Sequence, residues 1–132
     1  MNRFGEETIV ICVDFDGTCV THDFPYIGKD IGSVPVLKEI VEAGHRIVLF
    51  TMRSGEHLKH AEDWFKENDI ELYGSNVNPD QKFWTESPKA HGNMYIDDLA
   101  LGIPLTMDTS KSSRPFVNWT AVRAMLKGCG AL

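Results

Sequence analysis

Short apolar runs alternate along the chain with stretches in which apolar residues recur at the spacing of a helix. The runs at residues 8–13 (TIVICV) and 46–50 (RIVLF) are too short for helices and are typical of strands buried on both faces. A shorter run at 93–96 (NMYI) and two weaker ones at 70–73 and 103–107 predict further strands. The pattern therefore indicates five strands.

Three helices are predicted between and after these strands. The first starts at Pro35, which suits a first helical turn, and is capped by Gly44. The second is capped by Ser54 and has one apolar face, and the third covers residues 119–126. The apolar positions expected to pack inward are Val36, Leu37, Ile40 and Val41 in the first helix, Leu58, Ala61, Trp64 and Phe65 in the second, and Val122, Met125 and Leu126 in the third.

This alternation of strands and helices predicts an α/β fold. Because right-handed crossovers return each helix onto the sheet, we expect a parallel sheet covered on both faces, a Rossmann-like three-layer α/β/α arrangement. The length of 132 residues fits one domain, so residues 1–132 are expected to share a single core. The stretch after Thr18 contains Pro25, Gly28 and Gly32 without a sustained period, which predicts a short irregular flap.

Composition narrows the classes of function. The net charge of −6 argues against a general nucleic-acid-binding surface, and no apolar run approaches the roughly 18 residues that a membrane span needs. The first residues do not resemble a signal peptide, so we expect a cytoplasmic protein with no membrane role. Three cysteines without a CxxC spacing, Cys12, Cys19 and Cys129, favour reduced thiols over a disulfide framework or a zinc site.

Two acidic pairs stand where predicted strands end. Asp14 and Asp16 follow the first strand in the stretch DFDGT, and Asp97 and Asp98 follow the strand at 93–96. In open α/β sheets this edge is where ligands bind. One carboxylate of such a pair can act as a nucleophile and the other as an acid/base. The alternative is that these aspartates only cap the turns that end the strands, and the presence of the other motifs favours catalysis and metal binding.

A phosphate ester is the substrate that such a set of acids suits. Attack by Asp14 on phosphorus requires a cation to offset the repulsion between anions, and Asp97 and Asp98 can hold Mg²⁺, which prefers hard oxygen ligands. Asp16 can then give a proton to the leaving alkoxide and later take one from water, provided that neighbouring acids and burial raise its pKa. The Thr18 hydroxyl can hold the nucleophile's orientation.

Further polar residues are candidates for holding the phosphate. Thr51 ends the second strand, so its hydroxyl and the N–H groups of the following residues, Met52 and Arg53, can receive phosphate oxygens. The Arg53 side chain can grip a phosphate bidentately or pair with Glu56. The candidate substrate-binding residues are therefore Thr18, Met52 and Arg53. A fixed positive charge is expected from Lys89, just ahead of the second acidic pair, with Lys82 as its rival.

The order of these motifs resembles that of a known superfamily. DFDGT at residues 14–18, LFT ending at Thr51, SPK ending at Lys89 and YIDD ending at Asp98 are similar to the four motifs of the haloacid dehalogenase (HAD) superfamily of phosphohydrolases. The resemblance spans most of the chain. The stretch from SPK to IDD is also locally similar to the deoxyribonucleotidases of that superfamily.

This resemblance implies a role for each matching residue. It implies Asp14 as nucleophile, Asp16 as acid/base, and Thr51 and Lys89 as groups that stabilise the phosphate and the nucleophile. It also implies that Asp14, the backbone carbonyl of Asp16, and Asp97 or Asp98 bind Mg²⁺. The strand order implied is 5-4-1-2-3.

One departure from the deoxyribonucleotidases concerns the cap domain that they carry after the first motif. Only about fifteen residues separate Thr18 from the first helix here, which is below the usual size of a domain. The site is therefore expected to be open, or closed by the flap, by a partner subunit in a homo-oligomer, or by a bulky substrate.

The sequence thus predicts a capless Mg²⁺-dependent phosphatase that acts on a small or accessible phosphomonoester through an aspartyl-phosphate on Asp14. The alternatives are a phospho-acceptor signalling domain, which would carry its acidic pair on the first strand and its acceptor on the third, and a phosphate-binding module that has lost turnover. The presence of Asp16 disfavours the second alternative, because loss of the acid/base is the easiest route to a trap. A dehalogenase is less consistent with two acidic pairs.

Overall fold

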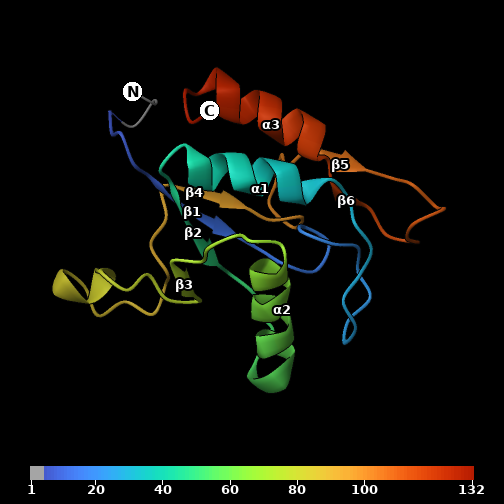
Figure 1. The fold of residues 1–132 in the computed structure, drawn as a ribbon, viewed down its shortest axis with the longest axis horizontal. Helices are drawn as coiled ribbons and strands as arrows, with labels where there is room; N and C mark the ends of the chain where they lie inside the picture. Colours follow the sequence, from blue (N-terminus) through green and yellow to red (C-terminus); the bar gives the residue numbers. More distant parts are fainter. Residues whose placement is uncertain (1–4) are drawn as a thin grey trace.

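The centre of the computed structural model, which describes residues 5–132, is a four-stranded parallel sheet in the order β3-β2-β1-β4 (Figure 1). Its two central strands are the apolar runs of the first and second predicted strands, which pair in register along their whole length. The strands are β1 (Val10–Val13), β2 (Arg46–Leu49), β3 (Gly74–Ser75) and β4 (Met94–Ile96). The predicted α/β class and parallel sheet are confirmed.

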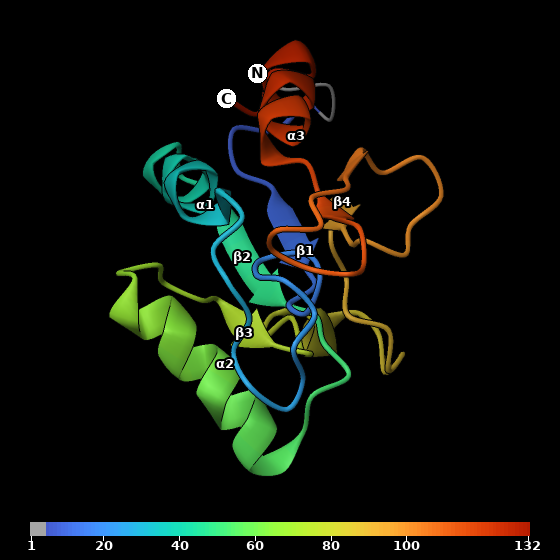
Figure 2. The ribbon, with the colours of Figure 1, turned by 90° about the vertical axis from the view of Figure 1, so that its right-hand side faces the viewer.

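Three α-helices connect and follow these strands, as predicted. They are α1 (Ser33–Glu42), α2 (Gly55–Glu67) and α3 (Trp119–Gly128). Gly44 follows the first with a positive φ of 91°, a conformation that glycine adopts without a steric penalty, and so ends it where expected. α1 and α3 lie side by side in both views (Figures 1 and 2), and their contact includes a pair between Arg123 and Glu39.

The two faces of the sheet are covered unequally. Ile11 and Val13 on one face join a large apolar cluster that contains buried residues of all three helices. Cys12 on the opposite face joins a small cluster with Val48 and Ala90. The segment 76–91, which contains a short 3-10 helix, η1 (Gln81–Phe83), contributes Ala90 to this small cluster.

The structure differs from the two weaker strand predictions, at 70–73 and 103–107. Residues 70–73 do not form a strand, because the chain turns at Asp69 and meets the sheet only at β3, although the Tyr73 N–H already donates to the Ile47 carbonyl. The last predicted strand contains β5 (Leu105–Thr106), which pairs antiparallel with β6 (Phe116–Val117) in a separate sheet.

The implied strand order is therefore confirmed for 4-1-2-3 and wrong for the fifth strand. Turns after Asp97 and Ala100 redirect the chain away from the edge of β4, and Pro104 has no N–H with which to extend a ladder. The prediction that Met125 packs inward is also wrong, because this side chain is exposed, whereas Val122 and Leu126 are buried.

The small β5–β6 sheet and α3 hold the loop that follows β1. The Val117 N–H donates to the Gly17 carbonyl, and the Trp119 indole donates to the Thr18 carbonyl at 2.7 Å. At the other end of the loop, the Asp14 N–H donates to the Ile96 carbonyl, which joins the ends of β1 and β4. The DFDGT stretch is thus fixed from three directions. No helix within residues 5–132 has the length and apolar character that a membrane crossing requires.

Candidate functional site

Three carboxylates converge at the carboxyl ends of β1 and β4. Asp14 directly follows β1, and Asp97 and Asp98 directly follow β4. One oxygen of each carboxylate lies within 4.8 Å of the others. Because β1 and β4 are neighbours and parallel, their carboxyl ends meet at one edge of the sheet and bring together residues that are more than eighty positions apart in the sequence.

Thr18 joins two members of this cluster. Its hydroxyl donates to Asp14 Oδ2 at 2.8 Å and accepts from the Asp98 N–H at 3.0 Å. The side chain is fully buried, which leaves it no face toward a substrate. The expectation that Thr18 orients the nucleophile agrees with this geometry, whereas its place among the substrate-binding candidates is corrected.

His22, to which the sequence motifs assign no role, contacts the cluster from the flap. Its Nε2 lies 2.8 Å from Asp98 Oδ2, and both side chains are largely buried. Gly17, with a φ of 81°, makes this approach possible, because a Cβ there would overlap His22 and Asp98. An irregular flap carries no periodic signal, so only the fold reveals this partner.

Burial and mutual repulsion make it unfavourable for all three aspartates of the cluster to be ionised. Burial raises the pKa of Asp14 from 3.8 to about 8, with repulsion from Asp97 and Asp98 adding to the effect and the hydrogen bond from Thr18 opposing it. Burial, together with the neighbouring Asp98, also raises the pKa of Asp97. Three acids therefore share a space in which ionising all of them is costly unless a positive charge enters.

The donor set fits a hard divalent cation. Carboxylate oxygens are the ligands that Mg²⁺ prefers, and one or two carboxylates suffice for it. Asp14, Asp97 and Asp98 would hold the ion, and both members of the second acidic pair belong to the cluster. The Asp16 carboxylate does not belong to it, so any part of Asp16 in metal binding is left to its backbone carbonyl, as the resemblance implies.

Asp16 faces Arg53 instead. Arg53 Nε donates to Asp16 Oδ2 and Nη2 donates to Asp16 Oδ1, both at 2.8 Å. The Arg53 side chain is 1% exposed, so it neither reaches a substrate in the cavity nor forms a surface pair with Glu56. Both expectations for Arg53 are corrected, because a buried guanidinium needs a buried carboxylate and Asp16 is the acid within its reach.

Thr51 lies at the end of β2, where it lines the same cavity. Its hydroxyl accepts from the Arg53 N–H at 3.1 Å, and its own N–H donates to the Asn76 side chain at 2.8 Å. Asn76, at the end of β3, thus fixes the Thr51 backbone, a role that no motif indicated. The hydroxyl hydrogen of Thr51 remains available to a ligand.

The cavity above the aspartates has a volume of about 330 Å³ and an apolar rim. Met52 and Leu99, which follow Thr51 and Asp98, are 97% and 80% exposed. Phe50 forms part of the wall. His22 is the only basic side chain among the residues lining this cavity.

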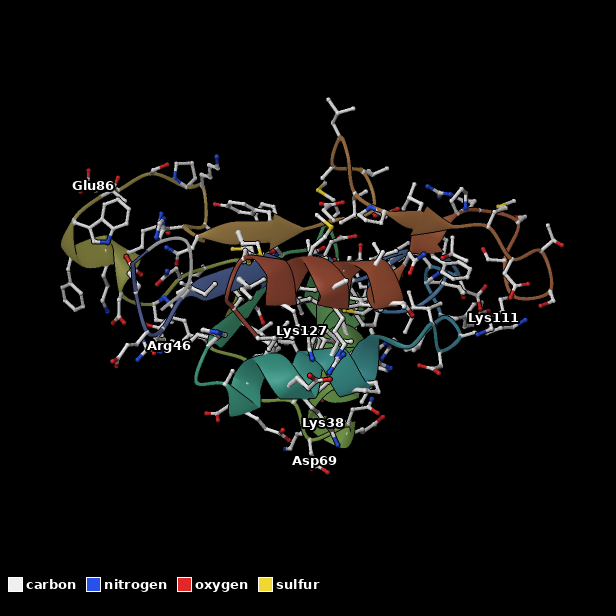
Figure 3. All side chains as sticks on the ribbon, turned by 90° about the horizontal axis from the view of Figure 1, so that it is seen from above. Lys38, Arg46, Asp69, Glu86, Lys111 and Lys127 are labelled. Atoms are coloured by element: carbon white, nitrogen blue, oxygen red, sulfur yellow. The ribbon has the colours of Figure 1, made fainter. Side chains whose placement is uncertain are left out.

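The two candidate lysines are not among the residues that line this cavity. Lys89 is exposed, with its ammonium 5.6 Å from the centre of the Tyr95 ring, and Lys82 packs over Phe83 in η1. Figure 3 shows Glu86, three residues before Lys89, beyond the end at which β4 begins, whereas the aspartates follow the end of β4. Tyr95 in turn packs against Phe50 of the cavity wall, and the assignment of Lys89 or Lys82 as the motif lysine stays a prediction.

Comparison with known proteins places the chain beside one solved structure. No protein-family model matches the sequence, and no curated protein matches it. The structure of a conserved protein coded by a locus from Bacteroides thetaiotaomicron is similar, with 32% sequence identity and a TM-score of 0.76, over 92% of this chain and 91% of that one. At this identity over nearly the full length of both proteins, the chain belongs to the same family as the conserved Bacteroides protein.

Proposed function

We propose that the protein is a Mg²⁺-dependent phosphatase of the haloacid dehalogenase type, which hydrolyses a phosphomonoester through an aspartyl-phosphate on Asp14. The observation that carries the proposal is the cluster of Asp14, Asp97 and Asp98, in which Thr18 orients the first carboxylate. The order of motifs along the chain supports the same assignment. The open cavity, with no cap domain within residues 5–132, suits a small or accessible phosphate ester.

In the first step, a carboxylate oxygen of Asp14 attacks phosphorus and the bond from phosphorus to the ester oxygen breaks. The Thr18 hydrogen bond holds Asp14 Oδ2, which leaves Oδ1 as the attacking atom. The leaving oxygen takes a proton from Asp16 and departs as an alcohol. The phosphoryl group is then bonded to Asp14.

In the second step, water attacks phosphorus while the Asp16 carboxylate takes one of its protons. The bond from phosphorus to the Asp14 oxygen breaks, which releases inorganic phosphate and restores the Asp14 carboxylate. Asp16 is again protonated and ready for the next ester. The same carboxyl group serves in both directions because it alternates between acid and base.

The proposed cation has a clear electrostatic task. Bound by the three carboxylates, Mg²⁺ would offset their charge and the negative charge of the phosphate. His22 would hold Asp98 in place through the contact at 2.8 Å, and Thr18 would do the same for Asp14. Because neither lysine lines the cavity, the proposal assigns the phosphate oxygens to Thr51 and to backbone N–H groups after β2.

The test is hydrolysis of p-nitrophenyl phosphate with Mg²⁺ or with a chelator, by the wild type, Asp14→Asn and a matched control. Asp63→Asn is the control, because Asp63 lies on α2 and pairs with Lys59 on the same helix. We expect activity that requires Mg²⁺, persists in Asp63→Asn and falls by about three orders of magnitude or more in Asp14→Asn.

Turnover without a divalent cation, or an active Asp14→Asn variant, would exclude the proposed mechanism. A distinct outcome separates the regulatory alternative. A wild type that gains a stable phosphoryl group on Asp14 from a small phosphodonor, seen as a mass increase, without releasing phosphate would be a phospho-acceptor rather than an enzyme.

A further inference from the structure

The guanidinium of Arg53 has a partner for every N–H group. Besides its two bonds to Asp16, Nη2 donates to the Tyr26 carbonyl at 2.8 Å, and Nη1 donates to the carbonyls of His57 and Pro25 at 3.2 and 3.4 Å. These five bonds use all five donors of the group. Arg53 therefore joins the loop after β1, the flap and the first turn of α2.

Two aromatic rings lie beside the guanidinium of Arg53. Its central carbon lies 5.0 Å from the centre of the Phe15 ring and 5.1 Å from that of Phe24. Phe24 in turn packs edge-on against His57. Moving Arg53 toward a substrate would break this packing and take all five N–H groups of a buried guanidinium away from their acceptors, which is costly. The side chain is thus a fixed part of the framework.

We propose that Arg53 is a positioning residue that fixes the carboxyl group of Asp16 in its orientation for proton transfer and ties that orientation to the flap. The proposal rests on the proposed function, since it concerns the acid/base of that reaction. A carboxylate offers two acceptor positions on each oxygen, and the parallel bonds from Arg53 occupy one on each. The remaining positions are left for the leaving group and for water.

The nature of the leaving group separates positioning from mere structural support. An alkyl phosphate releases a strongly basic alkoxide, which needs the proton of Asp16, whereas 2,4-dinitrophenyl phosphate releases a stable anion that does not. Loss of the correct Asp16 orientation must therefore slow the first ester more than the second. A variant that is only less well folded loses the same fraction of activity on both.

The experiment compares kcat/KM for propyl phosphate and 2,4-dinitrophenyl phosphate in the wild type and Arg53→Gln. We expect a loss of about tenfold to a hundredfold for the propyl ester and of less than about threefold for the dinitrophenyl ester. The specificity constant is the right quantity, because it reports the first chemical step even when hydrolysis of the intermediate limits kcat.

Two further variants protect the test against a failure to fold. Arg53→Lys keeps the buried positive charge but lacks the planar pair of donors, so it should show the same selective loss to a smaller degree. Arg123→Gln removes another arginine that holds a carboxylate, that of Glu39, between α1 and α3, and should affect both esters equally or not at all.

Asp16→Asn supplies the decisive cross-check. In this background, Arg53→Gln should no longer distinguish the two esters, because the group that it positions has been removed.

An equal loss on both esters in Arg53→Gln and Arg53→Lys, with the wild type active, would overturn the inference alone. A selective gain on the propyl ester would do the same. A wild type that hydrolyses neither ester with Mg²⁺ would overturn the proposed function, and the inference with it.

Discussion

The carboxyl edge of the sheet and the segment 76–91 are built in opposite ways. At the edge, the acidic side chains line the cavity and are themselves held, Asp14 by Thr18 and Asp98 by His22. In the segment 76–91, by contrast, the buried side chain that makes most of the hydrogen bonds is the neutral Gln81. The Gln81 amide donates to the carbonyls of Ser87 and Lys89 and accepts from the His91 N–H, while the charged groups of the segment lie outside.

This difference teaches that closeness in sequence does not bring a charge into a site. Lys89 stands eight residues before Asp97, but β4 lies between them, and a strand advances by about 3.3 Å per residue. The strand carries the chain from one edge of the sheet to the other. Asp14, eighty-three positions from Asp97, is its neighbour because β1 and β4 pair.

The largest effect on activity is expected when an acid at the carboxyl edge of the sheet is replaced. Asp97→Asn removes one of three charges that would hold Mg²⁺, so the concentration of Mg²⁺ that gives half-maximal phosphatase activity should rise by about a hundredfold. A magnesium titration of the initial rate measures it, with Asp63→Asn as the matched control. An unchanged requirement would exclude Asp97 from the cation site.

A smaller effect is expected at the partner of Asp98. His22→Asn shortens the side chain and breaks its contact with Asp98 Oδ2, so the apparent affinity for Mg²⁺ should fall by about tenfold. The saturating rate should change less, because the three carboxylates remain. Titration of the protein with Mg²⁺ alone, followed by calorimetry, tests this without reference to turnover. Wild-type affinity in the variant would show that the flap histidine does not support the cluster.

The pKa of Asp14 predicts how the metal-free protein responds to pH. Because folding raises this pKa from 3.8 to about 8, the native state binds more protons than the unfolded state between these values, and stability falls as pH rises through that range. The full difference corresponds to on the order of 5 kcal/mol. With a chelator present, Asp14→Asn should therefore melt about 5 °C or more above the wild type at pH 8.5.

The melting temperatures of the wild type and Asp14→Asn should become similar near pH 4, where Asp14 is protonated in the native wild type. Thermal melting across this pH range is the measurement. A wild type that becomes more stable between pH 5 and pH 8, while Asp14→Asn does not, would contradict the burial of this acid.

The smallest expected effect lies in the segment 76–91. Lys89→Ala should change kcat/KM for p-nitrophenyl phosphate by less than about twofold, because its ammonium packs over Tyr95 and does not line the cavity. Lys82→Ala should behave in the same way. A loss of a hundredfold in either variant would mean that the lysine enters the site during the reaction, and the contrast between the two regions would fail.

The sequence predicted the parts of the fold that local patterns encode. The runs that became β1 and β2 are apolar because both faces of these central strands are mostly buried, and the helices carry one apolar face at a regular spacing. Residues 70–73 were wrongly predicted as a strand because Ile70 is apolar and buried. Ile70 lies in a loop, and a loop residue can be buried without pairing in a sheet. The place of the fifth strand was predicted wrongly for another reason. The turns before β5 decide which strand it pairs with, and its own residues do not.

In the site, the acids were predictable and their partners were not. A carboxylate that follows a buried strand is visible in the sequence, and Asp14, Asp97 and Asp98 meet as expected. Arg53 was expected either to bind the substrate or to pair with Glu56, but its side chain is buried and pairs with Asp16. His22 carried no signal, because the flap that brings it to Asp98 has no periodic pattern.

The amino-acid sequence by itself determined which residues are candidates for the proposed chemistry, since an apolar run indicates a strand and the polar residue that ends the run lies at the edge of the sheet. Tertiary structure alone decided how these residues divide into groups. Asp14 and Asp16 are two positions apart, yet one faces Asp97 and Asp98 and the other faces Arg53. The physical reason is that a buried charge must find a partner in space, and the packing of strands, flap and helix decides which partner is within reach.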